Sequence, residues 1–196
     1  MAKIIPIKNG TRKDAITSLA AKLFKEKGYS ATSMRDLAEG IGVEAPSLYN
    51  HIGSKKELLQ DICKRIADVF MAHLIEIENS EQPTIKKIEA IIRFHIKMMI
   101  SEYEEVYLSD HEWKHLEYPF LTDFKNQRRN YRSRLGIMVK EGIKNLEIAN
   151  IDPYVVVLTI LSSVGGIESW HRSNKYIDAE TLTENLVKLL ISGIKR

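Results

Sequence analysis

The sequence predicts an all-α protein with an N-terminal three-helix bundle and a larger C-terminal helical domain. Apolar residues recur three and four positions apart along nearly the whole chain, which is the spacing of one helix face. No segment alternates between apolar and polar residues for long, as a half-buried strand would. Glycines, prolines and helix-capping residues divide the helical stretches, and we expect no sheet.

Composition places the chain among ordinary soluble globular proteins. Its 196 residues are enough to bury a core, and 44% are hydrophobic and 28% charged, which excludes a disordered tail and a collagen-like repeat. The single cysteine, Cys63, excludes an internal disulfide and fits a reducing compartment. No run approaches the roughly eighteen continuous apolar residues of a membrane span, and the first eight residues do not resemble a signal peptide.

Three short helices are expected at the start of the chain. The first covers residues 11–27, and Gly28 provides the left-handed residue that ends it. The second begins after Thr32 or Ser33, where Ser33 and Asp36 have the spacing of a capping box, and the glycines at 40 and 42 end it. The third covers residues 44–51. The apolar stripe of the first helix is Ile16, Leu19, Ala20, Leu23 and Phe24.

Longer helices fill the rest of the chain. Asp152-Pro153 and Asp178-Ala179 are favourable helix starts, and Tyr118-Pro119 is a break. The expected ranges are 55–78, 84–102, 105–117, 120–145, 153–173 and 179–195.

Charge is divided unevenly along the chain. Residues 1–65 contain 12 Lys/Arg and 7 Asp/Glu, a balance of +5, whereas residues 66–196 contain 17 and 19, a balance of −2. A basic first part on a mildly acidic body predicts that the first part meets a polyanion. The basic arm of Lys3, Lys8, Arg12 and Lys13 either follows a DNA backbone or is a disordered leader.

Two short helices joined by a glycine turn, after a packing helix, are the arrangement of a helix-turn-helix motif. The second helix needs small or polar residues toward the major groove and apolar residues toward the core, where Val43 and Leu48 would point. The alternative is a three-helix bundle without a nucleic-acid role. The predicted base-facing residues are Glu44, Ala45, Pro46, Ser47 and Asn50, and the predicted phosphate contacts are Tyr49, His51, Lys55, Lys56 and, through a helix N-terminus, Ser33.

This region resembles the DNA-binding domain of the TetR family of bacterial transcriptional regulators, continuously over about the first sixty residues. The resemblance implies that residues 1–54 bind DNA and that residues 55–196 form a helical ligand-sensing and dimerisation domain. Glu44 departs from a purely attractive pattern, so it either reads a cytosine or simply starts the helix. The segments that carry the resemblance are Ala20–Phe24, Gly28-Tyr29, Thr32–Glu39, Gly42-Val43, Leu48–Ile52 and Ser54–Leu59.

The segment 154–167 is apolar on nearly every side, which predicts a helix that is buried all round. Its two glycines allow another helix to approach closely, and residues 179–195 add a leucine seam. Together they suit a four-helix interface in a homodimer, and the alternative is a helix at the centre of a monomeric bundle. The predicted interface residues are Leu161, Gly165, Gly166, Leu186 and Leu190.

Aromatic and methionine residues on the middle helices are candidate pocket residues, although their spacing is also that of an ordinary core. An apolar tunnel would suit an acyl chain, and an arginine at its mouth would pair with phosphates. His95 either contacts ligand or is a hydrogen-bonded core histidine, and we favour the core histidine. The predicted ligand contacts are Phe70, Phe94, Met98, Tyr107, Trp113, Phe124, Arg128, Tyr131 and Trp170.

A second resemblance is to the branch of the TetR family that senses acyl-CoA and controls lipid degradation. It is carried by Glu112, Tyr131, Trp170 and the start of the last helix at 177–180, and it implies an apolar or acyl-CoA-like effector. The sequence departs from this branch at residues 144–147, where a glycine-rich turn is more usual.

The run His111-Glu112-Trp113-Lys114-His115 matches the H-E-x-x-H signature of zinc metalloproteases. No histidine or glycine follows at the extended spacing and no third ligand is evident, so we interpret the match as coincidence. No P-loop, G-x-G-x-x-G or G-x-S-x-G is present. We expect no catalytic residue, no metal and no cofactor.

The sequence therefore predicts a cytoplasmic, homodimeric, ligand-responsive transcriptional regulator, most simply a repressor. Its expected partners are double-stranded operator DNA, a small-molecule effector and a second copy of the chain, with no membrane. Ligand would move the helix at 55–78 and change the separation of the two recognition helices. The rival functions are a helical ligand-binding protein without a DNA role and a zinc hydrolase.

Overall fold

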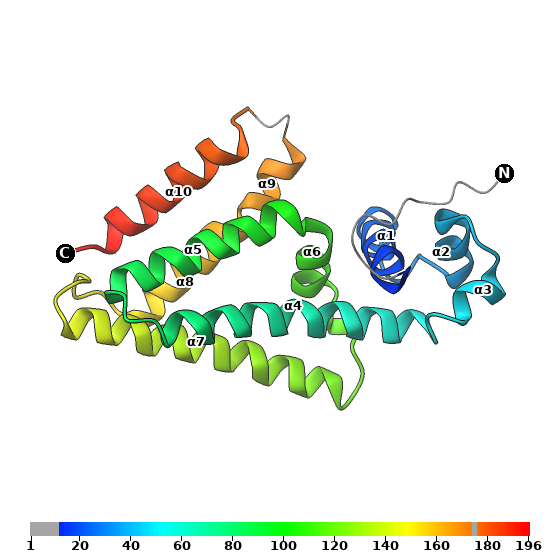
Figure 1. Cartoon of the computed structure of the whole chain (residues 1–196), viewed down its shortest axis with the longest axis horizontal. Coiled ribbons are helices and arrows are strands. Elements are labelled where there is room, and N and C mark those ends of the chain that lie inside the picture. Colours follow the sequence, from blue (N-terminus) through cyan, green and yellow to red (C-terminus); the bar gives the residue numbers. More distant parts are fainter. Residues whose placement is uncertain (1–11, 174–175) are drawn as a thin grey trace. The chain divides into compact units, whose positions relative to one another are not determined.

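The computed structural model of the chain describes residues 12–173 and 176–196, and these form mainly α-helices joined by loops (Figure 1). Over these residues the only β-type pairing is an isolated bridge between Ile148 and Lys195. The all-α prediction is confirmed. Contacts divide the chain into two compact units, residues 1–67 with 104–124, and residues 68–103 with 125–196. The division falls within α4 (Lys55–Glu78), and the functional boundary after residue 54 stays a prediction.

The first unit begins with the three short helices that the sequence predicts: α1 (Arg12–Lys27), α2 (Met34–Ile41) and α3 (Ala45–Tyr49). Gly28 and Gly42, with φ values of 87° and 75°, end the first two helices in the left-handed conformation that glycine adopts without strain. Helix α3 is shorter than the expected 44–51, because the backbone of Asn50 leaves the helical hydrogen-bond pattern after one and a half turns.

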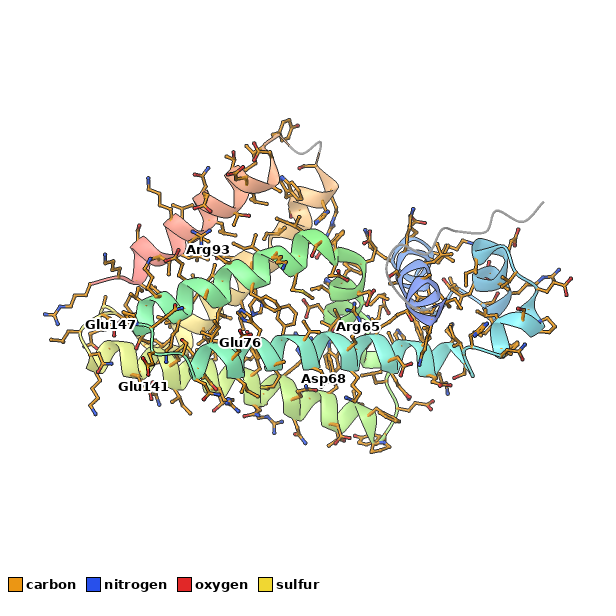
Figure 2. All side chains as sticks on the ribbon, viewed as in Figure 1. Arg65, Asp68, Glu76, Arg93, Glu141 and Glu147 are labelled. Carbon is orange, nitrogen blue, oxygen red and sulfur yellow. The ribbon has the colours of Figure 1, made fainter. Side chains whose placement is uncertain are left out.

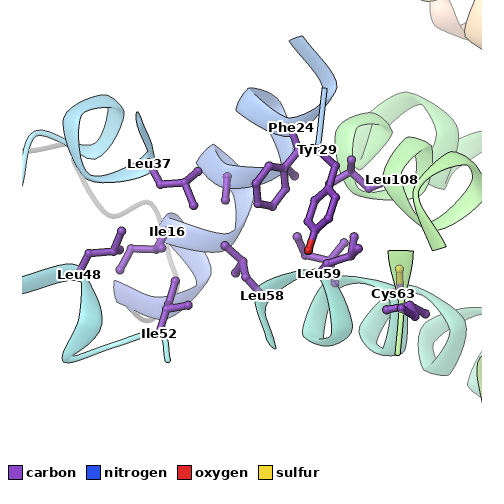
Figure 3. Close-up of a cluster of buried hydrophobic side chains, with 14 of the residues drawn as sticks. Ile16, Phe24, Tyr29, Leu37, Leu48, Ile52, Leu58, Leu59, Cys63 and Leu108 are labelled. Atoms are coloured by element: carbon purple, nitrogen blue, oxygen red, sulfur yellow. The ribbon is translucent and has the colours of Figure 1, made fainter. Parts of the chain in front are cut away.

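A single apolar cluster holds the first unit together (Figure 3). Phe24 of α1, Leu37 of α2 and Leu48 of α3 are each at most 1% exposed, and they meet Leu58 and Leu59 of α4, which are both 0% exposed. The cluster also includes Leu108, Leu116 and Phe124 from the second segment of the unit. The buried side of α3 is therefore held by a core that includes residues well beyond the three short helices.

The expected helix at 105–117 is instead two elements, α6 (Tyr103–His111) and the 3₁₀ turn η1 (Trp113–His115). The backbone at Glu112 has φ −102° and ψ −4°, away from ideal helical values, so the α-helical bonding stops there. The tighter turn that follows brings Leu116, 5% exposed, into the apolar cluster. Burial of that leucine is a tertiary effect that helical periodicity alone does not reveal.

In the second unit, α5 (Thr84–Ser101) packs against α8 (Pro153–Gly165), α9 (Ile167–Arg172) and α10 (Ala179–Ile194). The long helix α7 (Phe120–Lys144) contributes buried Leu135 to the same unit. Arg93 of α5 (Figure 2) places two guanidinium nitrogens 2.5 and 3.1 Å from the carboxylate oxygens of Glu184 on α10. This forked geometry is the one that arginine favours with a carboxylate, and it ties α10 to α5.

The expected helix at 153–173 is divided into α8 and α9 at Gly165-Gly166. By length and composition alone, residues 153–172 could cross a membrane, with a mean hydropathy of 1.2, although the sequence predicts no such segment. One such segment is weak evidence for a membrane span, because the core helix of a soluble protein passes the same test. Neither helix alone reaches the roughly twenty residues that a span requires.

Candidate DNA-binding and effector sites

Helices α2 and α3 form the predicted helix-turn-helix. The side chain of Ser33 accepts a hydrogen bond from the amide of Asp36 at 3.1 Å, and the carboxylate of Asp36 accepts from the amide of Ser33 at 2.8 Å. This confirms the capping box. At the other end of α2, the amides of Gly42 and Val43 donate to the carbonyls of Glu39 and Ala38, which fixes the turn into α3.

Helix α3 turns one face to the core and the other to solvent. Leu48 is 1% exposed, as predicted, whereas Tyr49 is 53% exposed. Pro46 is also exposed, and Ser47 is half-buried. The other predicted residues of this surface are exposed Glu44, Asn50 and His51 and half-buried Ala45.

The N-terminus of α2 carries its own acidic group. The Ser33 hydroxyl is engaged with Asp36, and Lys27 forms an ion pair with the same carboxylate at 3.1 Å. The bonds from Ser33 and Lys27 hold the pKa of Asp36 well below its ordinary value. A phosphate at this helix end would meet a carboxylate, and the contact predicted for Ser33 stays a prediction.

The two lysines at the start of α4 have different surroundings. The Lys55 ammonium lies 2.8 Å from the carbonyl oxygens of both Tyr29 and Thr32, and 4.5 Å from the centre of the Tyr29 ring. Lys56 forms an exposed ion pair with Glu117. In the basic arm, Lys13 pairs with Asp61 at 2.6 Å, while Lys3, Lys8 and the side chain of Arg12 lie outside the described residues.

A buried carboxylate joins three helices of the first unit. Glu105 of α6 is 5% exposed and accepts hydrogen bonds from Arg65 of α4 (Figure 2) and, at 3.2 Å, from the hydroxyl of Ser18 on α1. Because burying a carboxylate is costly unless it is paired, this arrangement favours one register of α6 against the DNA-binding helices.

In the second unit, three of the predicted ligand residues come together. The ring of Phe70 on α4 lies 5.7 Å from that of Phe94 on α5 and 6.3 Å from that of Tyr131 on α7. The Tyr131 hydroxyl is 2.7 Å from Nε2 of His95, which confirms the hydrogen-bonded core histidine. Burial, with a smaller effect of the neighbouring His73, lowers the pKa of His95 to about 3, so this ring is neutral at pH 7.

His73 is a residue that the sequence reading missed. Its ring stacks on Phe94 with centroids 3.8 Å apart, and among the described residues no group hydrogen-bonds its buried Nδ1. Burial lowers the pKa of His73 as well. A buried polar atom without a protein partner is a candidate ligand contact. Its spacing of three from Phe70 on one helix face was the available signal.

The other predicted ligand residues are distributed over both units. Met98 is buried on α5, Arg128 is half-buried on α7, and the indole nitrogen of Trp170 donates to the carbonyl of Ile177 at 2.9 Å. In the first unit, Phe124 is buried and its ring centre lies 6.3 Å from that of half-buried Trp113. Tyr107, also in the first unit, is half-buried on α6.

Two family descriptions match the chain. "Bacterial regulatory proteins, tetR family" matches residues 16–62, and "Tetracyclin repressor-like, C-terminal domain" matches residues 81–194. The chain belongs to the TetR family. It is therefore a DNA-binding transcriptional regulator with the helix-turn-helix in its first unit, and the TetR resemblance predicted from about the first sixty residues is confirmed.

Individual TetR-family proteins resemble the chain over nearly its whole length. The HTH-type transcriptional repressor KstR2 of Mycolicibacterium smegmatis is 21% identical over 196 residues, which is 99% of this chain and 96% of that protein. The structure of the ketosteroid transcriptional regulator KstR2 of Mycobacterium tuberculosis superposes with a TM-score of 0.88 at 21% identity, covering 99% of this chain and 100% of the other. AibR in complex with isovaleryl coenzyme A and operator DNA superposes with a TM-score of 0.79 at 24% identity, covering 92% and 98%. These structural likenesses establish the fold.

The TetR-family body of this chain presents an exposed apolar face on α8 and α10. Leu158 and Val155, one helical turn apart on α8, are 50% and 47% exposed, and Leu189 of α10 is 71% exposed. In the single chain only the face of α8 with Val156 and Ile160 is covered, so its expected burial on every side, which requires the second copy, stays a prediction. Of the predicted interface residues, Gly165 and Gly166 are exposed, Leu161 and Leu186 are half-buried, and Leu190 is 8% exposed.

The H-E-x-x-H run does not have the geometry of a zinc site. Both histidines must lie on one face of a regular helix, yet α6 ends at His111 and His115 lies in η1. His115 approaches Glu112 at 3.2 Å and packs on the ring of Tyr29 at 5.0 Å. Within the described ranges, no group of three or more His, Cys, Asp or Glu side chains could hold a metal ion.

Proposed function

We propose that this protein is a homodimeric repressor whose operator binding is released by a small apolar or acyl-CoA-like effector. The observation that carries the proposal is the exposed face of α3 on a head that the TetR-family description matches. Leu48 anchors this short helix in the core, so its opposite face is held rigidly toward solvent. A rigid, solvent-facing recognition helix is what major-groove reading requires.

On this face, Ala45, Pro46, Ser47 and Asn50 would contact base edges. A serine hydroxyl can donate to or accept from a base, and the proline ring can contact a thymine methyl. The exposed phenol of Tyr49, together with His51 and Lys56, would contact phosphates on either side. Glu44 has no side-chain capping bond on α3, so its carboxylate is available to a cytosine amino group.

The effector would bind in the second unit near Phe70, Phe94 and Tyr131. These rings provide an apolar surface, and Nδ1 of His73 provides one polar contact. The AibR structure named above holds isovaleryl coenzyme A, which supports an acyl-CoA effector, and KstR2 is described as a ketosteroid transcriptional regulator. Arg128 would pair with a phosphate of the coenzyme.

Helix α4 would couple the two sites, because residues 55–67 belong to the unit with the DNA-binding helices and residues 68–78 to the unit with Phe70. Two recognition helices must be roughly 34–36 Å apart to enter successive major grooves. The effector must bind better to a state with another spacing, since a ligand with equal affinity for both states shifts nothing.

The second copy would pack through α8 and α10. The exposed Val155, Leu158 and Gly165 follow one another at helical spacing on α8, and half-buried Leu186 and exposed Leu189 do so on α10. Two such helix pairs around a two-fold axis form a four-helix interface. We place the dimer in the cytoplasm with its operator, and we assign it no enzymatic activity.

The test uses fluorescence anisotropy to measure how tightly the purified protein binds a DNA fragment from its own upstream region. The measurement is made at several salt concentrations. Salt-sensitive binding that short acyl-CoA thioesters release is the expected result. A ligand-binding protein without a DNA role would bind the thioester but show no salt-sensitive binding to DNA. Mass spectrometry of molecules that co-purify with the protein would identify the natural effector. Stoichiometric zinc with peptidase activity would contradict the proposal.

A further inference from the structure

His73 of α4 carries a buried nitrogen that the chain does not satisfy. Its ring stacks on that of Phe94 of α5, with centroids 3.8 Å apart and planes 5° from parallel. The stack fixes the plane in which both ring nitrogens can form hydrogen bonds. Nδ1 is buried, and in the described parts of the chain no group is hydrogen-bonded to it. Such an atom costs free energy until a partner reaches it.

A second histidine of the same unit shows the contrast. The ring of His95 stacks on that of Phe70 at 4.4 Å, and its Nε2 lies 2.7 Å from the hydroxyl of Tyr131. The polar atom of His95 is therefore explained by packing within the chain. Packing does not explain Nδ1 of His73, because an apolar side chain could cover the ring of Phe94 without leaving a polar atom unpaired.

The rings of this cluster are enclosed by protein but not fully covered. Burial lowers the pKa of His95 to about 3, which shows how far the surrounding protein excludes bulk water from its neighbourhood. The side chains of Phe70, Phe94 and His95 are nevertheless only half-buried. Enclosed rings that keep accessible surface can be covered further by an apolar group.

The charge and position of His73 indicate what its partner is. Burial lowers the pKa of His73, so the ring is neutral at pH 7 and offers one N–H donor. A carboxylate held against the ring of Phe94 would lose its hydration at high cost, whereas a neutral oxygen would lose little. His73 is itself half-buried, and the exposed side chains of Glu76 (Figure 2) and Lys97 are close enough to affect its pKa. The partner is therefore a neutral oxygen at the border between an apolar and a polar group.

We propose that Nδ1 of His73 donates a hydrogen bond to the carbonyl oxygen of an acyl thioester, and that this residue distinguishes acyl-CoA from coenzyme A conjugates without the carbonyl. In every acyl-CoA this oxygen is neutral and lies between the apolar acyl chain and the polar coenzyme. The acyl chain would cover the rings of Phe70 and Phe94. This inference rests on the effector binding proposed above, and it names the atom by which the thioester is recognised.

Two ligands that differ only at this oxygen test the contact. Hexanoyl-CoA has the carbonyl group, and the thioether S-hexyl-CoA has a methylene group in its place. In isothermal titration calorimetry, the unaltered protein should bind hexanoyl-CoA on the order of tenfold more tightly, because the thioether leaves Nδ1 unpaired. In His73→Phe, which keeps a ring against Phe94, the two affinities should be equal. If His73→Phe does not fold, His73→Leu takes its place with the same expectation.

Glu76→Gln is the matched control. It removes an exposed charge next to His73 on the same helix but leaves Nδ1 in place, so the preference for hexanoyl-CoA should remain. Equal affinities for the two ligands in the unaltered protein overturn the proposal. A preference that survives in His73→Phe, or that is lost in Glu76→Gln as fully as in His73→Phe, also overturns it.

A second measurement observes the nitrogen in the unaltered protein. With ¹⁵N-labelled histidine, an Nδ1–H signal of His73 that is protected from solvent exchange should appear with hexanoyl-CoA and not with S-hexyl-CoA. Its absence with hexanoyl-CoA overturns the contact. If neither ligand binds, the acyl-CoA effector of the proposed function fails together with this contact. If hexanoyl-CoA binds and releases operator DNA but S-hexyl-CoA binds equally well, only the contact with His73 fails.

Discussion

The hydroxyl of Tyr131 on α7 and Nε2 of His95 on α5 are 2.7 Å apart in the interior of the second unit. Tyr131 is 8% exposed, and the ring of Phe70 stacks 4.4 Å from that of His95. In such a setting each group depends on the other for its hydrogen bond, since an unpaired buried polar atom is expensive. The pair therefore fixes α5 against α7 beside the proposed effector site.

Replacing Tyr131 by phenylalanine tests this dependence. The variant keeps the ring but leaves Nε2 of His95 without its partner, and we expect the free energy of unfolding to fall by about 1–3 kcal/mol in urea titrations. Tyr176→Phe is the matched control, because Tyr176 is 88% exposed and lies in the same unit. Its effect should stay within about 0.5 kcal/mol. Equal stability of the two variants would show that the buried bond contributes nothing.

The same pair makes stability depend on pH. Burial lowers the pKa of His95 to about 3, below the roughly 6.5 of a histidine in the unfolded chain. Between these two pH values the unfolded chain binds more protons, so the free energy of unfolding falls as the pH decreases, by up to about 1.4 kcal/mol per pH unit. The lowered pKa of His73 adds an effect of the same sign.

His95→Gln separates the contribution of His95 from the others, because glutamine can still hydrogen-bond to Tyr131 but does not titrate. Between pH 6.5 and 4.5, the unfolding free energy of the variant should fall less steeply than that of the unaltered protein. Parallel pH profiles of the two proteins would contradict the assignment.

Periodicity and capping predicted the helices that do not depend on distant contacts. The limits of α1 and α4 follow from the apolar stripe and from Gly28, and the capping box at Ser33 and Asp36 is present as expected. The end of α6 was missed because it depends on Leu116 packing into a core made by the first helices. Such a contact has no local signature.

The sites were predictable to different degrees. The spacing of Pro46, Leu48 and Tyr49 determines which face of α3 is exposed, so this surface could be read from the sequence. The carbonyl partners of Lys55 could not, because Tyr29 and Thr32 are more than twenty positions away and their carbonyl oxygens carry no side-chain signal. Similarly, a helix that is apolar on every side, such as α8, does not reveal which side its own chain leaves open.

A turn after α7 departs from the usual pattern of the acyl-CoA-sensing branch and is strained. Leu146 has φ 60°, the left-handed conformation that favours glycine, and its side chain is 64% exposed. The amide of Glu147 donates to the carbonyl of Gly142 at 2.9 Å, so the backbone bond that closes the helix requires this conformation. Leu146→Gly should therefore raise the free energy of unfolding by about 1 kcal/mol, measured in urea. Leu146→Ala, which retains a Cβ atom, should not.

Substitutions of base-contacting and of phosphate-contacting residues on the recognition surface should change operator binding in different ways. Ser47→Ala should alter which base-pair substitutions in the operator are tolerated. At the base pair that Ser47 contacts, the free energy of discrimination against the wrong base should fall by about 1–3 kcal/mol. Tyr49→Phe removes one exposed hydroxyl and should weaken binding to all operator variants alike. Anisotropy against a panel of single-base operator variants measures both. Parallel losses across the panel for Ser47→Ala would exclude base reading by that residue.

The exposed apolar face of α8 and α10 predicts how the protein assembles. Leu158 and Leu189 are 50% and 71% exposed in the single chain, and a lysine at either position would have to bury its charge in a helix–helix interface. In sedimentation equilibrium, Leu158→Lys and Leu189→Lys should shift the protein from dimer to monomer, while the helical circular dichroism signal is retained.

Ile137→Lys on α7 is the control, because Ile137 is similarly exposed at 53% but lies on neither helix of the proposed interface. It should remain dimeric. Operator binding should follow the oligomeric state, since a monomer presents one recognition helix and loses the second half-site. If the Leu158 and Leu189 variants stay dimeric, or if Ile137→Lys dissociates, the two copies pair through another face. If monomeric variants bind the operator as tightly as the unaltered protein, pairing is not what places the two heads on DNA.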